Sequence, residues 1–245
     1  SFEASIPLGL ERALQRAIAM RVAGKPVAKI IGHKEFWGRL FHVSEAVLDP
    51  RPDSETLIEA ALPLLPQKQN LQLIDLGTGS GCLLLTLLAE REMARGLGID
   101  KSRAALFIAR LNAHRLDVRN RVAFRLGDWL VGEAVRADMI VANPPYIESA
   151  EIARLGKAVR LYDPLGALDG GADGLTAYRR LIAPAFMHLK NGGHLILEID
   201  ATKAAAVTRL MTEAGFEEIL LRQDLAGRDR ILLGQKNARK NKKGV

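Results

Sequence analysis

A glycine-rich segment follows an apolar stretch near residue 71 and precedes a second apolar stretch that begins at Cys82. Glycines let the backbone approach a ligand closely, and a helix N-terminus offers free N–H groups. These are the properties of loops that bind nucleotide cofactors. The segment reads Asp75, Leu76, Gly77, Thr78, Gly79, Ser80 and Gly81.

The glycine spacing in this segment is G-x-G-x-G, not the G-x-G-x-x-G of dinucleotide-binding loops. S-adenosylmethionine has no pyrophosphate for a loop to surround, so a different loop is reasonable for it. Its methionine carboxylate can use loop N–H groups. We therefore expect S-adenosylmethionine as the cofactor, bound by Gly77 to Gly81.

Three further side chains fall at expected strand ends and suit the rest of this cofactor. Asp100 comes 19 positions after Gly81, where a carboxylate can accept both ribose hydroxyls. The alternative is that Asp100 caps the helix beginning at Ser102. Asp128 can accept the exocyclic amine of adenine, and Trp129 can present its ring to the base. The alternative for this pair is a core tryptophan beside a turn-capping aspartate.

The sequence Asn143-Pro144-Pro145-Tyr146 follows the fourth expected strand, at the edge where α/β enzymes react. The two prolines stiffen the loop. An amide nitrogen is a poor nucleophile because resonance withdraws its lone pair. The Asn143 side-chain carbonyl and the Pro144 backbone carbonyl can accept its two N–H bonds, while Tyr146 stacks on the planar group. Such positioning needs no ionised base before transfer.

Strand-like and helix-like segments alternate after residue 71, which predicts a doubly wound, mostly parallel α/β sheet. A final pair, 216–222 and 230–233, is expected to be antiparallel, as in the Rossmann-like sheet of S-adenosylmethionine-dependent methyltransferases. The other expected strands are 71–76, 96–100, 122–126, 138–142 and 194–199. The expected helices are 82–91, 102–116, 176–189 and 203–214.

The part before this sheet is expected to be a small helical and hairpin region over residues 1–66, used for substrate docking. It holds a helix at 8–23, a hairpin within 30–43 and a rigid turn at 50–53, after which Asp53 or Ser54 caps a helix. Residues 67–235 form the methyltransferase domain and 236–245 a basic tail. Since the chain begins at Ser1 without Met, we expect it to lack earlier residues.

Composition narrows the class of protein. The 245 residues are 48% hydrophobic and 26% charged, which is ordinary for a globular protein of this length. The single cysteine excludes an intrachain disulfide and suits a reducing, cytoplasmic location. No Cys/His cluster has metal spacing, and the apolar run at 82–89 is too short for a membrane span. The net charge of +7 favours acidic partners, nucleic acid among them.

Together these motifs resemble the HemK/PrmC family of release factor glutamine N5-methyltransferases, over nearly the whole chain. The resemblance is carried by the glycine loop, by Asn143 to Tyr146, and by four further segments. These are residues 38–43, Pro50 to Glu55, Val159 to Leu168, and Asp224 to Arg230. Ser54 stands where the family usually has Thr, and the segment after Glu198 lacks the usual Gly and Gln.

The resemblance implies that Gly77 to Gly81, Asp100, Trp129 and Asn143 bind the cofactor. It further implies that Asn143 to Tyr146 hold the glutamine of the Gly-Gly-Gln motif of class 1 peptide-chain release factors. The alternative is a nucleic-acid methyltransferase acting on adenine N6 or guanine N2, since the same loop can hold a flipped base. The chain has no basic, aromatic-interleaved recognition segment, so nucleic acid is not the expected substrate.

Overall fold

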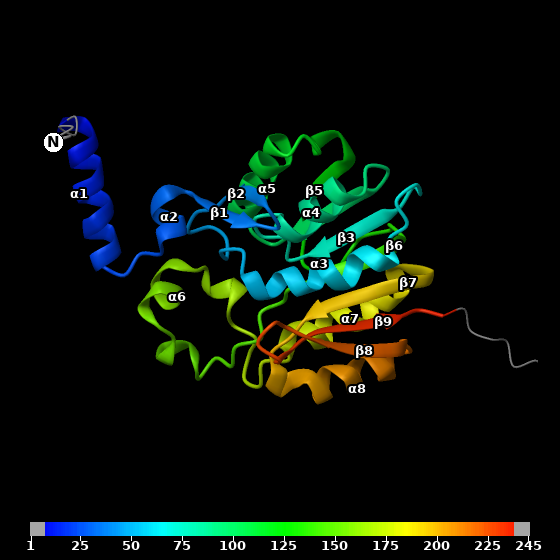
Figure 1. Ribbon diagram of the computed structural model, residues 1–245. Coiled ribbons are helices and arrows are strands. Elements are labelled where there is room, and N and C mark those ends of the chain that lie inside the picture. Colours follow the sequence, from blue (N-terminus) through cyan, green and yellow to red (C-terminus); the bar gives the residue numbers. More distant parts are fainter. Residues whose placement is uncertain (1–7, 238–245) are drawn as a thin grey trace, which may run out of the picture.

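One seven-stranded sheet organises the protein, as shown by a computed structural model that describes residues 8–237 (Figure 1). The strands lie in the order β5-β4-β3-β6-β7-β9-β8. Neighbours from β5 to β7 are parallel, and β9 runs antiparallel to both β7 and β8. Their bounds are β3 Gln72–Leu76, β4 Arg95–Asp100, β5 Val122–Leu126, β6 Ala137–Ala142, β7 Leu189–Glu198, β8 Glu217–Gln223 and β9 Asp229–Gln235.

The predicted fold class is therefore confirmed, including the terminal antiparallel pair. The reason is local: short apolar runs flanked by helices on both sides favour parallel strands buried on both faces. Successive side chains of β6 show this, because Met139 packs into the hydrophobic core on one face of the sheet and Ile140 into the core on the other. The strand ends agree with the sequence to within a residue or two, except that β7 begins at Leu189 instead of His194.

Helices cover the two faces of the sheet (Figure 1). Leu57 and Leu84 pack into the core of one face, and Tyr178 and Met211 into the core of the other. The first core therefore lies under α3 and α4, and the second under α7 and α8. The main helices are α3 Glu55–Ala61, α4 Cys82–Glu90, α5 Arg103–Arg115, α7 Thr176–His188 and α8 Ala204–Ala214. None within residues 8–237 is long and apolar enough to cross a bilayer.

The N-terminal part begins with α1 Leu8–Val22, which projects away from the sheet (Figure 1). The short helix α2 Val27–Ile31 and the hairpin β1 His33–Phe36 and β2 Arg39–His42 follow. Phe36 and Phe41 of the hairpin meet edge to face and join the same core as α3. The domain boundary at residue 66 stays a prediction, and most of the basic tail lies outside the described residues.

One local expectation was wrong and another holds only in part. Ile30 and Ile31 belong to helix α2 and not to the hairpin, because Pro26 precedes the helix and Gly32, at a φ of 78°, ends it. Ser54 does stand at the N-cap position of α3, as expected, but its side chain makes no capping hydrogen bond. Both side chains have other partners: Asp53 forms an ion pair with Arg230, and the Ser54 hydroxyl donates to Glu198. The short helix α6 Lys157–Tyr162 was not expected at all.

Candidate functional site

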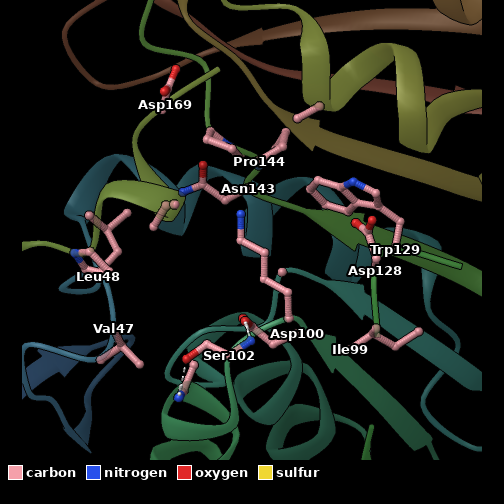
Figure 2. Close-up of a pocket in the computed structure, with 18 of the residues that line it drawn as sticks. Val47, Leu48, Ile99, Asp100, Ser102, Asp128, Trp129, Asn143, Pro144 and Asp169 are labelled. Carbon is pink, nitrogen blue, oxygen red and sulfur yellow. Dashed lines mark hydrogen bonds between the residues drawn. The ribbon is translucent and has the colours of Figure 1, made fainter. Parts of the chain in front are cut away.

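A cavity of about 580 Å³ opens at the carboxyl ends of the central parallel strands (Figure 2). This is the edge where ligands bind in open α/β sheets. Two sets of predicted residues line it together. The expected cofactor residues in its wall are Gly77, Asp100, Asp128, Trp129 and Asn143, and Pro144 and Pro145 join them from the reaction loop.

The glycine loop lies directly beneath this cavity. Gly77, Gly79 and Gly81 have φ values of 73°, 55° and 81°, a region that side-chain-bearing residues rarely adopt. A Cβ on Gly81 would also lie 2.8 Å from a Leu85 methyl carbon. Only Gly77 of the five loop residues lines the cavity. The Thr78 hydroxyl instead turns away and donates to Asp75 at 2.6 Å.

Asp100 connects the loop to the next helix. One carboxylate oxygen accepts the Gly79 N–H at 2.9 Å, and the other accepts the Ser102 N–H at 2.8 Å. Ser102, not Asp100, is the N-cap of α5, since its hydroxyl accepts from Ala105 N. Each carboxylate oxygen has two acceptor positions. Asp100, which lines the cavity, therefore keeps one free acceptor position per oxygen, the number that two ribose hydroxyls would require.

Asp128 and Trp129 form the far wall of the cavity (Figure 2). Trp129 has a φ of 56°, an unusual backbone conformation for a bulky side chain. Its ring lies 3.8 Å from the point where a Cβ on Gly77 would be. Asp128 pairs with Arg180 of α7, and about half of each side chain is exposed. The Trp129 ring and the Asp128 carboxylate thus line the same cavity as Asp100.

The reaction loop begins where β6 ends. Pro144 is buried, and the Asn143 side-chain nitrogen lies 3.4 Å from the Ser54 hydroxyl oxygen. Tyr146 does not line the cavity. Its ring packs against the core beneath α7, and burial raises the pKa of its hydroxyl to about 12. The structure therefore brings Asn143 to Pro145 to the cavity and directs Tyr146 elsewhere.

Two further segments contribute to the wall of the cavity: residues 46–48, which the sequence did not indicate, and Pro164, Gly166 and Ala167. The second falls within the segment Val159 to Leu168, which carries the family resemblance but was assigned no binding role. The buried side chain of Lys29 connects the first of these segments to the residues just before the second. Its ammonium group donates to Val47 O at 3.1 Å, to Tyr162 O and to the Asp163 carboxylate at 2.5 Å. Removing one partner of such a buried ion pair strongly destabilises a fold, because the other charge is left without compensation. No short motif surrounds Lys29, so sequence reasoning had no signal for it.

Two buried carboxyl groups lie at this edge, and neither was expected as a site residue. Burial raises the pKa of Asp75 to about 7, and burial likewise raises the pKa of Glu198 to about 7. Asp75 Oδ1 has no hydrogen-bond partner within residues 8–237. A buried carboxylate oxygen without a partner, beneath the loop expected to hold the methionine part, fits the positive charge of that group's amino nitrogen. The site therefore fits S-adenosylmethionine.

The matching family model is the "Methyltransferase small domain", over residues 51–159. A release factor glutamine methyltransferase of Cereibacter sphaeroides is 46% identical over 89% of this chain and 77% of its own length. One of Rhodospirillum rubrum is 44% identical over 93% of this chain and 70% of its own length.

Solved structures match the fold. A methyltransferase of Pyrococcus furiosus has a TM-score of 0.60 at 18% identity, covering 92% of this chain and 98% of its own. An RNA methyltransferase of Salinibacter ruber, in complex with S-adenosyl-L-homocysteine, has a TM-score of 0.51 at 19% identity, covering 78% of this chain and 94% of its own. At these identities the likeness is one of fold.

Proposed function

Because this chain belongs to the family of release factor glutamine methyltransferases, we propose that it methylates a glutamine side chain of a release factor. The methyl donor is S-adenosylmethionine, and the acceptor is the N5 amide nitrogen. As the resemblance implies, the glutamine is that of the Gly-Gly-Gln motif in class 1 peptide-chain release factors. Such a substrate, together with the single cysteine, supports a cytoplasmic location.

One observation carries this proposal. Asn143 and Pro144 line the same cavity as Asp100 and Trp129. A planar amide held by the first two residues would therefore lie beside a cofactor held by the second two. Juxtaposition of this kind turns a reaction between two molecules into one within a single complex, which alone lowers the barrier substantially.

The residues divide the work between holding the cofactor and orienting the amide. Asp100 would accept hydrogen bonds from the ribose, and Asp128 and Trp129 would contact the adenine. When bound, the cofactor supplies a methyl group made electrophilic by its sulfonium. The Asn143 side-chain carbonyl and the Pro144 backbone carbonyl accept the two amide N–H bonds. Held at both hydrogens, the nitrogen can pyramidalise and direct its lone pair toward the methyl group, and its proton afterwards leaves to water.

Transfer of labelled methyl to a purified class 1 release factor tests the proposal. The matched control is the same release factor with the Gly-Gly-Gln glutamine replaced by alanine. Parallel reactions contain duplex DNA or RNA in place of protein. We expect label only in the parent release factor. Label in nucleic acid, with none in the release factor, would favour the exocyclic-amine alternative and rule out the release factor as the substrate.

A further inference from the structure

A chain of side chains lies behind Asn143, on the side away from the cavity. The Asn143 side-chain nitrogen faces the Ser54 hydroxyl at 3.4 Å, and that hydroxyl donates to Glu198 Oε2 at 2.5 Å. A hydrogen bond from Asn143 also helps to lower the pKa of Glu198 against the larger effect of burial. Both groups facing the Asn143 nitrogen are therefore hydrogen-bond acceptors.

Three distant parts of the sequence meet here because of the sheet topology. Ala142 of β6 pairs with Leu197 of β7 in parallel register, so the residues that follow them, Asn143 after β6 and Glu198 at the end of β7, lie at the same level of the sheet. Ser54 arrives from the short 3₁₀ turn Pro52–Ser54 ahead of α3. Ser54 and Glu198 are 3% and 2% exposed, so water does not compete for their hydrogen bonds.

The direction of the hydrogen bonds in this chain follows from the number of protons available. An ionised Glu198 can only accept, so the single Ser54 proton must point to it. The Ser54 oxygen then has only lone pairs left, and the Asn143 side-chain nitrogen faces it as the donor. The Asn143 amide is thereby fixed with its nitrogen toward Ser54, which leaves its carbonyl oxygen for the cavity.

The opposite orientation would defeat the reaction. An Asn143 amide turned by a half rotation would present its NH₂ group to the substrate amide, placing donor against donor. Protonating Glu198 makes this orientation accessible, because a carboxylic acid can donate to Ser54 and let Ser54 donate to the Asn143 carbonyl. Asp53, Cys82, Tyr146 and Arg230 also act on the charges around Glu198. Of these, Arg230 favours the ionised form.

We propose that Ser54 and Glu198 are positioning residues for methyl transfer, which orient the Asn143 amide so that its carbonyl oxygen accepts from the substrate amide. The inference rests on the proposed function, because it assigns Asn143 to the substrate. It also gives a role to two segments of the sequence that the cofactor does not explain, the Pro-Arg-Pro-Asp-Ser-Glu turn and the end of β7. Neither residue touches the reacting atoms.

Three variants test the chain. Ser54→Ala removes the hydroxyl, Ser54→Thr keeps it, and Glu198→Gln removes the charge at constant shape. With release factor at saturating cofactor, we expect Ser54→Ala to lower kcat about tenfold or more, the worth of one hydrogen bond to a charged group. Ser54→Thr should stay within about twofold, since it keeps that bond. Binding of S-adenosylhomocysteine, followed by calorimetry, should change little in all three.

The pH profile separates orientation from simple stabilisation. In the parent, kcat should fall as the pH drops through about 7, where Glu198 takes up a proton. This acid limb should be absent in Glu198→Gln, whose kcat should be lower and flat. Saturating cofactor is needed because Asp75 has a similarly raised pKa beneath the cofactor loop. Parent-like kcat in Ser54→Ala, or an unchanged acid limb in Glu198→Gln, would overturn the proposal.

A measurement without substrate keeps this test apart from the proposed function. The carboxyl carbon of Glu198 can be titrated by NMR in ¹³C-labelled protein and identified by its absence in Glu198→Gln. Loss of the Ser54 donor should raise the pKa of Glu198. An unchanged titration in Ser54→Ala would mean that the chain does not exist. If the titration shifts but the parent methylates no release factor, the hydrogen-bond chain is supported and the assigned substrate is wrong.

Discussion

The cofactor edge of the sheet, at the ends of β3, β4 and β5, is built differently from the reaction edge, at the ends of β6 and β7. The first relies on backbone conformation and on single side chains next to each strand, such as Asp100. The second relies on side chains from three distant segments, Ser54, Asn143 and Glu198. We therefore expect the cofactor edge to tolerate changes outside its motif better than the reaction edge, which requires three distant segments to meet.

The largest expected effect breaks the reaction edge alone. Asn143→Ala should lower methyl transfer by about a hundredfold or more, because orientation of the nucleophile is lost. The affinity for S-adenosylhomocysteine should stay within a modest factor in calorimetry. A circular dichroism spectrum like that of the parent is the control for folding. Asn143→Asp, which keeps an acceptor oxygen, should retain partial activity. Near-parent turnover in Asn143→Ala would show that Asn143 does not hold the substrate amide.

Asp100→Ala should have the complementary effect on the cofactor edge. It removes acceptors for the ribose and also the bonds that hold Gly79 and Ser102. Each lost bond to a charged acceptor is worth about 1.5–3 kcal/mol, so S-adenosylhomocysteine affinity should fall about tenfold or more, and kcat at saturation much less. The affinity of Asp100→Asn, which keeps one acceptor oxygen, should lie between those of the parent and Asp100→Ala. Unchanged affinity would mean that Asp100 only holds the loop through Gly79 and Ser102 and does not bind the ribose.

A smaller effect should appear in the pH dependence of stability. Between its ordinary pKa of 3.8 and the raised value of about 7, folded Asp75 holds a proton that the unfolded chain releases. Stability from this group is therefore lost as the pH rises through that window. Urea unfolding without cofactor measures this effect. Relative to the parent, the free energy of unfolding of Asp75→Asn should rise between pH 5 and pH 8, by on the order of 1 kcal/mol. A constant difference across this range would contradict the raised pKa.

The smallest effect concerns the far wall of the cavity. The Asp128–Arg180 pair is about half exposed, so Arg180→Ala should change the free energy of unfolding by less than about 1 kcal/mol. Asp128→Asn is the matched variant. If Asp128 accepts the adenine amine, Asp128→Asn should weaken S-adenosylhomocysteine binding more than Arg180→Ala does. Equal losses in calorimetry would mean that only the ion pair matters there.

How much the sequence could predict follows the same division. Gly77, Asp100 and Asn143 stand at strand ends, so local pattern was enough to place them at one cavity. The fold class followed from the alternation of apolar runs. Ser54 was taken for a helix cap, because a serine before a helix has that preference. Only the three-dimensional structure reveals that its hydroxyl donates to Glu198 instead, 144 residues away in the sequence.

The remaining misses have a similar cause. Lys29 is buried by contacts with segments more than 100 residues away, at Tyr162 and Asp163, and no local pattern records such a partner. Tyr146 stands in the reaction motif, yet packing against the core decides where its ring lies. Sequence patterns thus place residues along an edge of the sheet, while side-chain direction depends on neighbours that only the three-dimensional structure supplies.

The position of β9 has a consequence for how the protein is made. Strand β9 is the last strand in the described chain, yet it lies between β7 and β8 and pairs with both. During synthesis, β7 must therefore keep an open hydrogen-bonding edge until residues 229–235 leave the ribosome. An unpaired apolar edge invites association with other chains. Nascent chains stalled before β9 should consequently need a chaperone, although every residue that lines the cavity has already been made.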